Sequence, residues 1–323
     1  MPSAKPYVGI DLGGTNMQVG VVSADLKMLS RAKRKTKPDE GRDAVIDRIV
    51  DAINEACQEA KIALADLGGV GIGAPGAVDP RKGVVIEAVN LRWNDLALAD
   101  LLTKRLKVRT WLDNDVNVAV LGENRIGAGK GCEHLLGVWC GTGIGAGLIL
   151  NGSLYYGDAM TAGEIGHTIL FPGCPRGSRS LEHNCSRTAV VDRLVRLIRA
   201  NHPSMIVDEV GGDLSAIKSK ALGKCYEAGD KLVREVIDTT ADMLGVGIAN
   251  AATLLSLQRV VLGGGLTEAV GKPFVDRVQA AARALVFPDA LRRLEVVASK
   301  LEDDAGVYGA AMIAADRAEE KSK

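Results

Sequence analysis

Two segments far apart in the chain share one plan, and this repetition is the strongest constraint on the fold. VGIDLGGTNMQVGVV (8–22) and LGVWCGTGIGAGLIL (136–150) each contain an apolar β-rich run, a glycine-rich turn and a second β-rich run. Repeated lobes often retain only this degree of similarity. A chain of 323 residues is also longer than one hydrophobic core usually spans. We therefore expect two α/β lobes, each containing one such hairpin.

The rest of the chain alternates between short β-rich runs and helical patterns, as an α/β fold requires. The sequence predicts strands over Tyr7–Ile10, Gln18–Val22, Val70–Gly73, Val108–Leu112, Leu135–Cys140, Gly147–Leu150 and Arg259–Leu262. It predicts helices over Asp43–Ala65, Val116–Asn124, Val190–Ala200, Asp230–Leu255 and Val307–Ala318. The last helix could pack on either lobe.

Composition excludes several classes of protein. Forty Lys and Arg balance forty Asp and Glu, and aromatic residues make up only 3%. A general polyanion binder would need a basic excess. The basic run SRAKRKTK (30–37) could form a nucleic-acid or targeting patch, but the zero net charge favours a solvated edge strand.

The expected location follows from what the sequence lacks. We find no apolar run long enough to span a membrane and no apolar core of a secretory signal at the start. The six cysteines are scattered and form no CxxC pair, so reduced thiols are expected. These features predict a soluble cytoplasmic protein that binds neither nucleic acid nor membrane.

Both glycine-rich turns are candidate phosphate sites. In the first, Gly13 and Gly14 allow backbone N–H groups to converge, Thr15 adds a hydroxyl, and Asp11 could hold Mg²⁺. Thr142 and Gly143 repeat this logic in the second turn. Either turn alone could be an ordinary hairpin connection. The glycine triplet containing Gly264 and Gly265 would let a flat ring such as adenine approach the main chain, although taken by itself it is better explained as a plain turn between a helix and a strand.

Polar side chains elsewhere suggest a sugar site. Asn114 and Asp115 follow a predicted strand and begin a helix, where the helix dipole favours an ionised carboxylate, although simple N-capping is the commoner role. Glu164 and His167 lie in a glycine-containing loop and offer an acceptor and a donor for sugar hydroxyls. A helical Glu-x-x-His iron site would need a second copy, which the sequence lacks.

Taken together, these motifs resemble the ROK family of sugar kinases, and in particular its glucokinase-like members. The resemblance covers almost the whole chain and rests on IDLGGT (10–15), GIGAPGAVD (71–79), NDVNVAVLGE (114–123), GTGIGAGLILNG (141–152), AGEIGHT (162–168), LEHNCSRTA (181–189) and VLGGGL (261–266). It implies an actin-like ATPase (ribonuclease H-like) fold with two α/β lobes, each around a five-stranded mixed sheet, and an active site in the cleft between them. The lobes would comprise residues 1–115, joined by the final helix at about 305–318, and residues 116–304.

The resemblance also assigns roles. Asp115 matches the catalytic base, and the sugar would be held by Gly76, Asn114, Asp115, Glu164, His167 and Glu182. Asp11, Gly13, Gly14, Thr15, Thr142 and Gly143 match the phosphate and Mg²⁺ side, while Gly264 and Gly265 match the adenosine side. A homodimer is implied by the family alone.

One segment departs from the family pattern. The family usually follows the His of GEIGH with a CxCGxxGC zinc cluster, whereas only Cys174 lies between His167 and Leu181 here, and Ser180 stands where the last cysteine would fall. A tetrahedral Cys₃His site cannot form from this segment, so we predict no structural zinc and assign no residue as a zinc ligand.

The expected activity is ATP-dependent phosphorylation of the 6-hydroxyl of a hexose, with glucose favoured by the LEHNCSRTA segment. N-acetylmannosamine, allose and fructose are the alternative substrates, and polyphosphate is an alternative donor. A sugar-sensing regulator is the alternative outside enzymes. Family repressors carry a helix-turn-helix before the kinase-like part, and here IDLGGT begins at residue 10, so we expect an enzyme.

Overall fold

The computed structural model describes residues 5–320, which form two compact units. Unit 1 extends to Gly127 and adds Tyr156–Ala162 and the chain from Asp303 onward. Unit 2 comprises Ala128–Tyr155 and Gly163–Glu302. The sequence-based division ended the first lobe at residue 115, whereas the structure keeps the following helix, residues 115–126, in unit 1.

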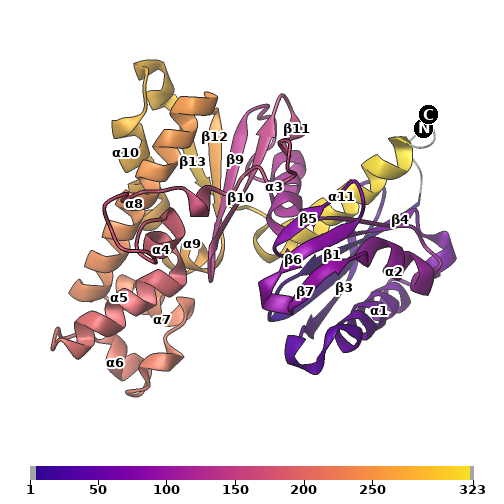
Figure 1. Cartoon of the computed structure of the whole chain (residues 1–323), viewed down its shortest axis with the longest axis horizontal. Coiled ribbons are helices and arrows are strands. Elements are labelled where there is room, and N and C mark those ends of the chain that lie inside the picture. Colours follow the sequence, from indigo (N-terminus) through magenta and orange to yellow (C-terminus); the bar gives the residue numbers. More distant parts are fainter. Residues whose placement is uncertain (1–4, 321–323) are drawn as a thin grey trace. The chain divides into compact units, whose positions relative to one another are not determined.

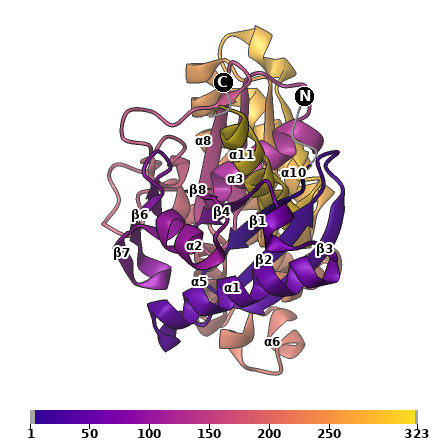
Figure 2. The same ribbon diagram turned by 90° about the vertical axis from the view of Figure 1, so that its right-hand side faces the viewer.

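Unit 1 is built on a five-stranded mixed sheet in the order β3-β2-β1-β4-β8 (Figure 2). The first three strands are antiparallel neighbours, and β4 and β8 run parallel to β1. Its strands are β1 (Tyr7–Leu12), β2 (Asn16–Val22), β3 (Met28–Lys35), β4 (Gly69–Ala74) and β8 (Thr110–Asn114). A small antiparallel sheet adds β5 (Ala77–Asp79), β6 (Val84–Ala88) and β7 (Trp93–Leu96).

The two faces of this sheet are covered in different ways. Apolar side chains such as Val8 and Ile10 join the core formed with α1 (Arg42–Glu59) and α2 (Leu98–Leu106). Successive strand residues face opposite sides, so Gly9 faces the other way, where a Cβ would overlap the carbonyl of Val307. Helix α11 (Ala305–Glu320) therefore lies directly on the strand backbone.

Helix α3 (Asp115–Ile126) packs on α11 with similar closeness. A Cβ at Gly309 of α11 would overlap the Val118 carbonyl of α3, and one at Gly122 would lie 2.5 Å from the Ala305 carbonyl oxygen. This backbone-to-backbone contact is the physical reason that α3 belongs to unit 1.

Unit 2 repeats the architecture of unit 1. Its sheet has the order β11-β10-β9-β12-β13, in which β9, β10 and β11 are antiparallel neighbours and β12 and β13 run parallel to β9 (Figure 1). These strands are β9 (Leu135–Cys140), β10 (Ile144–Leu150), β11 (Ser153–Leu154), β12 (Arg259–Gly263) and β13 (Glu295–Ala298). The two glycine-rich hairpins thus occupy equivalent places in two sheets of the same topology, as the repeat predicted.

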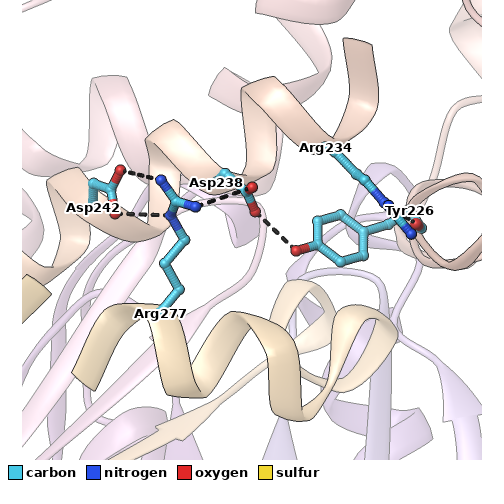
Figure 3. Close-up of polar contacts among 5 residues, drawn as sticks. All are labelled: Tyr226, Arg234, Asp238, Asp242 and Arg277. Atoms are coloured by element: carbon cyan, nitrogen blue, oxygen red, sulfur yellow. Dashed lines mark hydrogen bonds and ion pairs between the residues drawn. The ribbon is translucent and has the colours of Figure 1, made fainter. Parts of the chain in front are cut away.

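Helices form the rest of unit 2: α4 (Leu181–Cys185), α5 (Arg187–Arg199), α6 (Ile206–Glu209), α7 (Ser219–Glu227), α8 (Lys231–Leu255), α9 (Gly265–Val270) and α10 (Lys272–Leu285). Figure 3 shows how charged side chains join two of them. Arg277 of α10 donates to both Asp238 and Asp242 of α8, and Asp238 also accepts from the Tyr226 hydroxyl at 2.8 Å. Arg234 lies over the ring of Tyr226, 5.6 Å from its centroid.

Most predicted elements are present, with shifted ends. The predicted helix over Asp43–Ala65 ends at Glu59, and β10 begins at Ile144, inside the second glycine turn. The basic run forms the edge strand β3, where Arg31 and Lys33 pair with Asp304 and Asp303, which confirms the edge-strand interpretation. No helix within residues 5–320 is long and apolar enough to cross a membrane.

Candidate functional site

The first glycine turn connects β1 to β2 in unit 1. Gly13 N–H donates to the carbonyl of Asn16 at 2.9 Å, which closes the turn, and Thr15 is exposed at its tip. Thr36, a fully buried residue beyond β3, donates its hydroxyl to the Gly13 carbonyl at 2.6 Å and its N–H to the Thr15 carbonyl at 2.9 Å. The sequence analysis did not identify Thr36, because its role depends on strand pairing.

Carboxylates gather beside this turn. The pKa of Asp11 is raised to about 7, chiefly by burial and then by the negative charges of Asp115 and Asp303, while Lys33 opposes the rise. Asp11 is the penultimate residue of β1 and Asp115 follows β8, and the two strands lie in one sheet with β4 parallel to both. Their carboxyl ends therefore meet at one edge, where ligands of α/β sheets commonly bind. This arrangement favours a cation among the carboxylates.

Asn114 connects this edge to the loop that contains Gly76. Its side-chain oxygen accepts from Val116 N–H at 2.9 Å and caps α3, while its amide nitrogen donates to the Gly76 carbonyl at 3.1 Å. Gly76 has φ +88°, and a Cβ there would overlap the carbonyl of Glu87. Asp115, the first residue of α3, accepts from Val116 N–H at 2.9 Å.

A buried carboxyl, Asp113, supports these residues from the end of β8. It accepts from Asn114 N–H at 2.8 Å, from the Asn117 amide at 3.2 Å and from the Tyr156 hydroxyl at 2.6 Å. Burial raises the pKa of Asp113, and these hydrogen bonds oppose the rise. Tyr156 was not predicted, because nothing in its local sequence distinguishes it.

The second glycine turn, in unit 2, is held by two helices. Glu182 of α4 accepts from Ile144 N–H at 2.7 Å, so this predicted sugar ligand lies against the turn. At the start of α5, Arg187 donates to the Thr142 hydroxyl at 2.9 Å, and Thr188 donates to the Thr142 carbonyl at 2.8 Å. A Cβ at Gly143 would overlap the Glu182 carboxylate, which would have to move away from the turn.

Glu164 and His167 lie in a loop packed on β10. Gly163 has φ +105°, and a Cβ there would lie 2.5 Å from the Ala146 carbonyl oxygen, so the loop approaches the strand backbone closely. The His167 side chain is 70% exposed, with Nε2 3.7 Å from a Glu164 carboxylate oxygen. Both side chains are thus accessible to a ligand.

Backbone pairing shapes the segment that departs from the family's zinc loop. Ile169 bridges to Ser180, Leu170 N–H donates to the Arg179 carbonyl at 2.8 Å, and Leu181 N–H donates to the Thr168 carbonyl at 3.0 Å. Across residues 5–320, no group of three or more His, Cys, Asp or Glu side chains is arranged to hold a metal ion. The ends of this segment are therefore tied together by main-chain hydrogen bonds.

The glycine triplet forms the turn from β12 into α9. Gly264 has φ +86°, and a Cβ there would lie 2.7 to 2.9 Å from backbone atoms of Cys140. A Cβ at Gly265 would lie 2.8 Å from the hydroxyl oxygen of Ser219, which is buried and has no hydrogen-bond partner in the described chain. An unsatisfied buried hydroxyl beside a glycine turn suits a polar ligand atom.

Comparison with known proteins identifies the class and the family. A ROK-family glucokinase from Streptomyces griseus, solved in complex with glucose and AMPPNP, superposes with a TM-score of 0.83 and is 28% identical, covering 95% of this chain and 98% of that one. The architecture is that of the actin-like ATPase fold, with two sheets of mixed strands flanked by helices.

The ROK family model matches residues 7–317, and the chain belongs to this family. A glucokinase from Thermotoga maritima is 32% identical over 98% of this chain and 99% of that protein. A xylose repressor from Caldicellulosiruptor bescii is 26% identical over 96% of this chain and 78% of the repressor.

Proposed function

We propose that this protein transfers the terminal phosphoryl group of Mg-ATP to the 6-hydroxyl of glucose, with Asp115 as the general base. The enzyme class rests on the family and on relatives named glucokinase at about 30% identity. The choice of glucose follows from those relatives and from the LEHNCSRTA segment.

One observation carries the assignment of the base. Asp115 is the first residue of α3 and lies at the carboxyl edge of the sheet, close enough to Asp11 to raise its pKa. The N-terminus of α3 favours the ionised form of Asp115, which is the form that accepts a proton. In the proposed reaction, Asp115 takes the proton of the sugar 6-hydroxyl while that oxygen attacks the terminal phosphorus.

The remaining residues bind and orient. The donors of Asn114 and His167, together with the acceptors of Glu164 and Glu182, offer the mixed hydrogen bonding that a sugar needs. Phosphate oxygens would be held by the two glycine turns, through Gly13, Gly14, Thr15, Thr142 and Gly143. Adenosine would lie against Gly264 and Gly265, with Ser219 beside them.

Asp11 fits a role beside Mg²⁺. This ion usually takes one or two protein carboxylates and completes its shell with water and phosphate oxygens, so a larger acidic cluster is not required. When bound, Mg²⁺ neutralises charge on the transferring phosphate groups. A cation would also relieve the repulsion between Asp11 and Asp115.

The test combines a substrate panel with one variant. ADP release is measured with Mg-ATP and glucose, N-acetylmannosamine, allose or fructose, and again with polyphosphate as donor. We expect the highest kcat/KM with glucose and ATP. Asp115→Ala should lower kcat by roughly 10²–10⁴-fold while calorimetry still detects sugar binding.

Asp66→Ala is the matched control, because Asp66 is an exposed carboxylate of the same unit that lies outside the site. Near-normal turnover by Asp115→Ala would refute the assignment of the base. A higher kcat/KM for another hexose would refute glucose, and sugar binding without any ADP release would favour the sugar-sensing alternative.

A further inference from the structure

A concave pocket of about 390 Å³ lies in unit 2 between α5 and the segment that leads through α4. We call it the α5 pocket. Its walls include Ser178, His183, Asn184, Arg193, Arg196 and Arg199. None of the residues assigned above to sugar, phosphate or adenosine lines it.

The α5 pocket carries positive charge that protein carboxylates do not neutralise. Arg193, Arg196 and Arg199 follow one another at three-residue intervals and so lie along neighbouring positions of α5. Within residues 5–320, no ion pair joins any of the three to a carboxylate, although Asp192 is also in the wall. By contrast, Arg277 in the same unit is paired with two aspartates.

The positive charge of Arg193 is the least favourably placed of the three. It is half-buried, and its guanidinium donates to the Asn184 carbonyl at 3.4 Å. Burial lowers the pKa of Arg193, and the neighbouring charge of Arg196 lowers it further. Because Arg193 is partly removed from water and held near the like charge of Arg196, an anion that enters the pocket would stabilise its charged form.

The chemistry of the walls narrows the class of ligand. Guanidinium groups match the oxygens of a phosphate in a bidentate fashion. Ser178, His183 and Asn184 add neutral donors and acceptors of the kind that bind hydroxyl groups. The volume falls within the range typical of small-molecule sites. A concave pocket containing Asp192 suits a compact ligand better than a long polyanion.

We propose that the α5 pocket binds a phosphomonoester of a small polyhydroxylated molecule, that is, a sugar phosphate, at a site separate from the glycine turns. The observation that carries this proposal is the cluster of three unpaired arginines in a concave wall with hydroxyl-binding groups. The proposal does not depend on the proposed function, because its test measures binding.

The experiment is a calorimetric titration of the full-length protein with glucose 6-phosphate. AMPPNP, Mg²⁺ and glucose are present at saturating concentrations, so that the nucleotide and sugar sites are occupied. We expect binding that Arg196→Gln/Arg199→Gln weakens at least tenfold, since each arginine would donate charge-assisted hydrogen bonds to phosphate. Inorganic phosphate should bind more weakly than glucose 6-phosphate, because it cannot use the hydroxyl-binding wall.

The matched control is Arg292→Gln/Arg293→Gln, which removes two exposed arginine charges from the same unit outside the pocket. It should bind as the wild type does, and circular dichroism should show that both double variants are folded. Equal binding by the pocket variant and the wild type, or no binding by the wild type, would overturn the proposal. Equal affinity for inorganic phosphate would overturn the sugar-phosphate assignment.

These outcomes are separable from those of the kinase assay. A protein that phosphorylates glucose but binds no glucose 6-phosphate under saturating AMPPNP and glucose retains the proposed function and loses the α5 site. A protein that binds the probe through Arg196 and Arg199 but releases no ADP retains the site and loses the proposed function.

Discussion

The two glycine turns occupy equivalent positions in sheets of the same strand order, yet different structures support them. The first turn lies beside a half-buried carboxyl, Asp11, and is tied to a neighbouring strand end through Thr36. The second turn is held from α4 and α5 by Glu182, Arg187 and Thr188.

This difference gives the two turns different electrostatic surroundings. Around the first turn, Asp11, Asp115 and Asp303 create negative charge that favours a cation. Around the second turn, Arg187 and the N-terminus of α5 supply positive charge beside the Glu182 carboxylate.

Of the predictions that compare the two turns, the largest expected effect is the loss of kcat/KM when a glycine of the second turn is changed to alanine. In Gly143→Ala, the added Cβ overlaps the Glu182 carboxylate and breaks its hydrogen bond to Ile144 N–H. We expect kcat/KM to fall by about 100-fold, since small displacements in a reacting site have effects of that order.

Gly14→Ala is the comparison variant in the first turn. Its Cβ would lie 3.1 Å from the Cβ of Asn90, a close contact that a displacement of a few tenths of an ångström relieves, so we expect less than about a tenfold loss. Steady-state kinetics checks both variants. Equal losses would contradict the claim that the two turns are supported differently.

The second prediction concerns the buried charge at the first turn. The pKa of Asp11 is about 7 in the folded state against 3.8 for the unfolded reference, so wild-type stability falls as the pH rises from about 4 to 7. In metal-free buffer, Asp11→Asn should match the wild type in stability near pH 4. Above pH 7 it should be more stable, by roughly 2 kcal/mol, as measured by urea unfolding.

Asp25→Asn is the control in the same unit, because the pKa of Asp25 is lowered whereas that of Asp11 is raised. Hydrogen bonds from Lys27 and Ser23 lower the pKa of the exposed Asp25 carboxyl, so neutralising it should not raise stability at any pH. A pH-independent difference between Asp11→Asn and the wild type would contradict the burial of charge at Asp11.

The smallest expected effect is on the KM for ATP, and it tests whether Arg187 at the second turn contributes to phosphate binding. Arg187→Gln removes the donor to Thr142 and one positive charge from the second turn, and the KM for ATP should rise roughly three- to tenfold. Arg125→Gln is the control, because it breaks an exposed ion pair with Asp316 in unit 1. An unchanged KM for ATP in Arg187→Gln would remove Arg187 from the phosphate environment.

Much of the fold could be predicted from the sequence because local patterns determine it. The repeated hairpins, the strand ending in Leu262–Gly263 and the long helix before it follow from apolar periodicity and glycine punctuation. The ends of elements were less predictable: β10 begins inside the second glycine turn because its Ile144 pairs with Cys140 of β9.

The candidate residues were identified by their motifs, but the groups that support them were not. Four supporting residues lie far in the sequence from the turns or carboxyls beside them: Thr36, Tyr156, Arg187 and Ser219. Their side chains are of common types, and only strand pairing and helix packing bring them into place.

The sequence by itself determined two α/β units, their glycine turns and the acidic residue that begins α3, because these features depend on neighbouring residues and backbone freedom. The tertiary structure alone decided that Asp11 lies near Asp115, that Glu182 contacts the second turn and that three arginines of α5 line one pocket. Such juxtapositions depend on long-range packing, and the free energy of burying charge is set by the environment and not by the residue type.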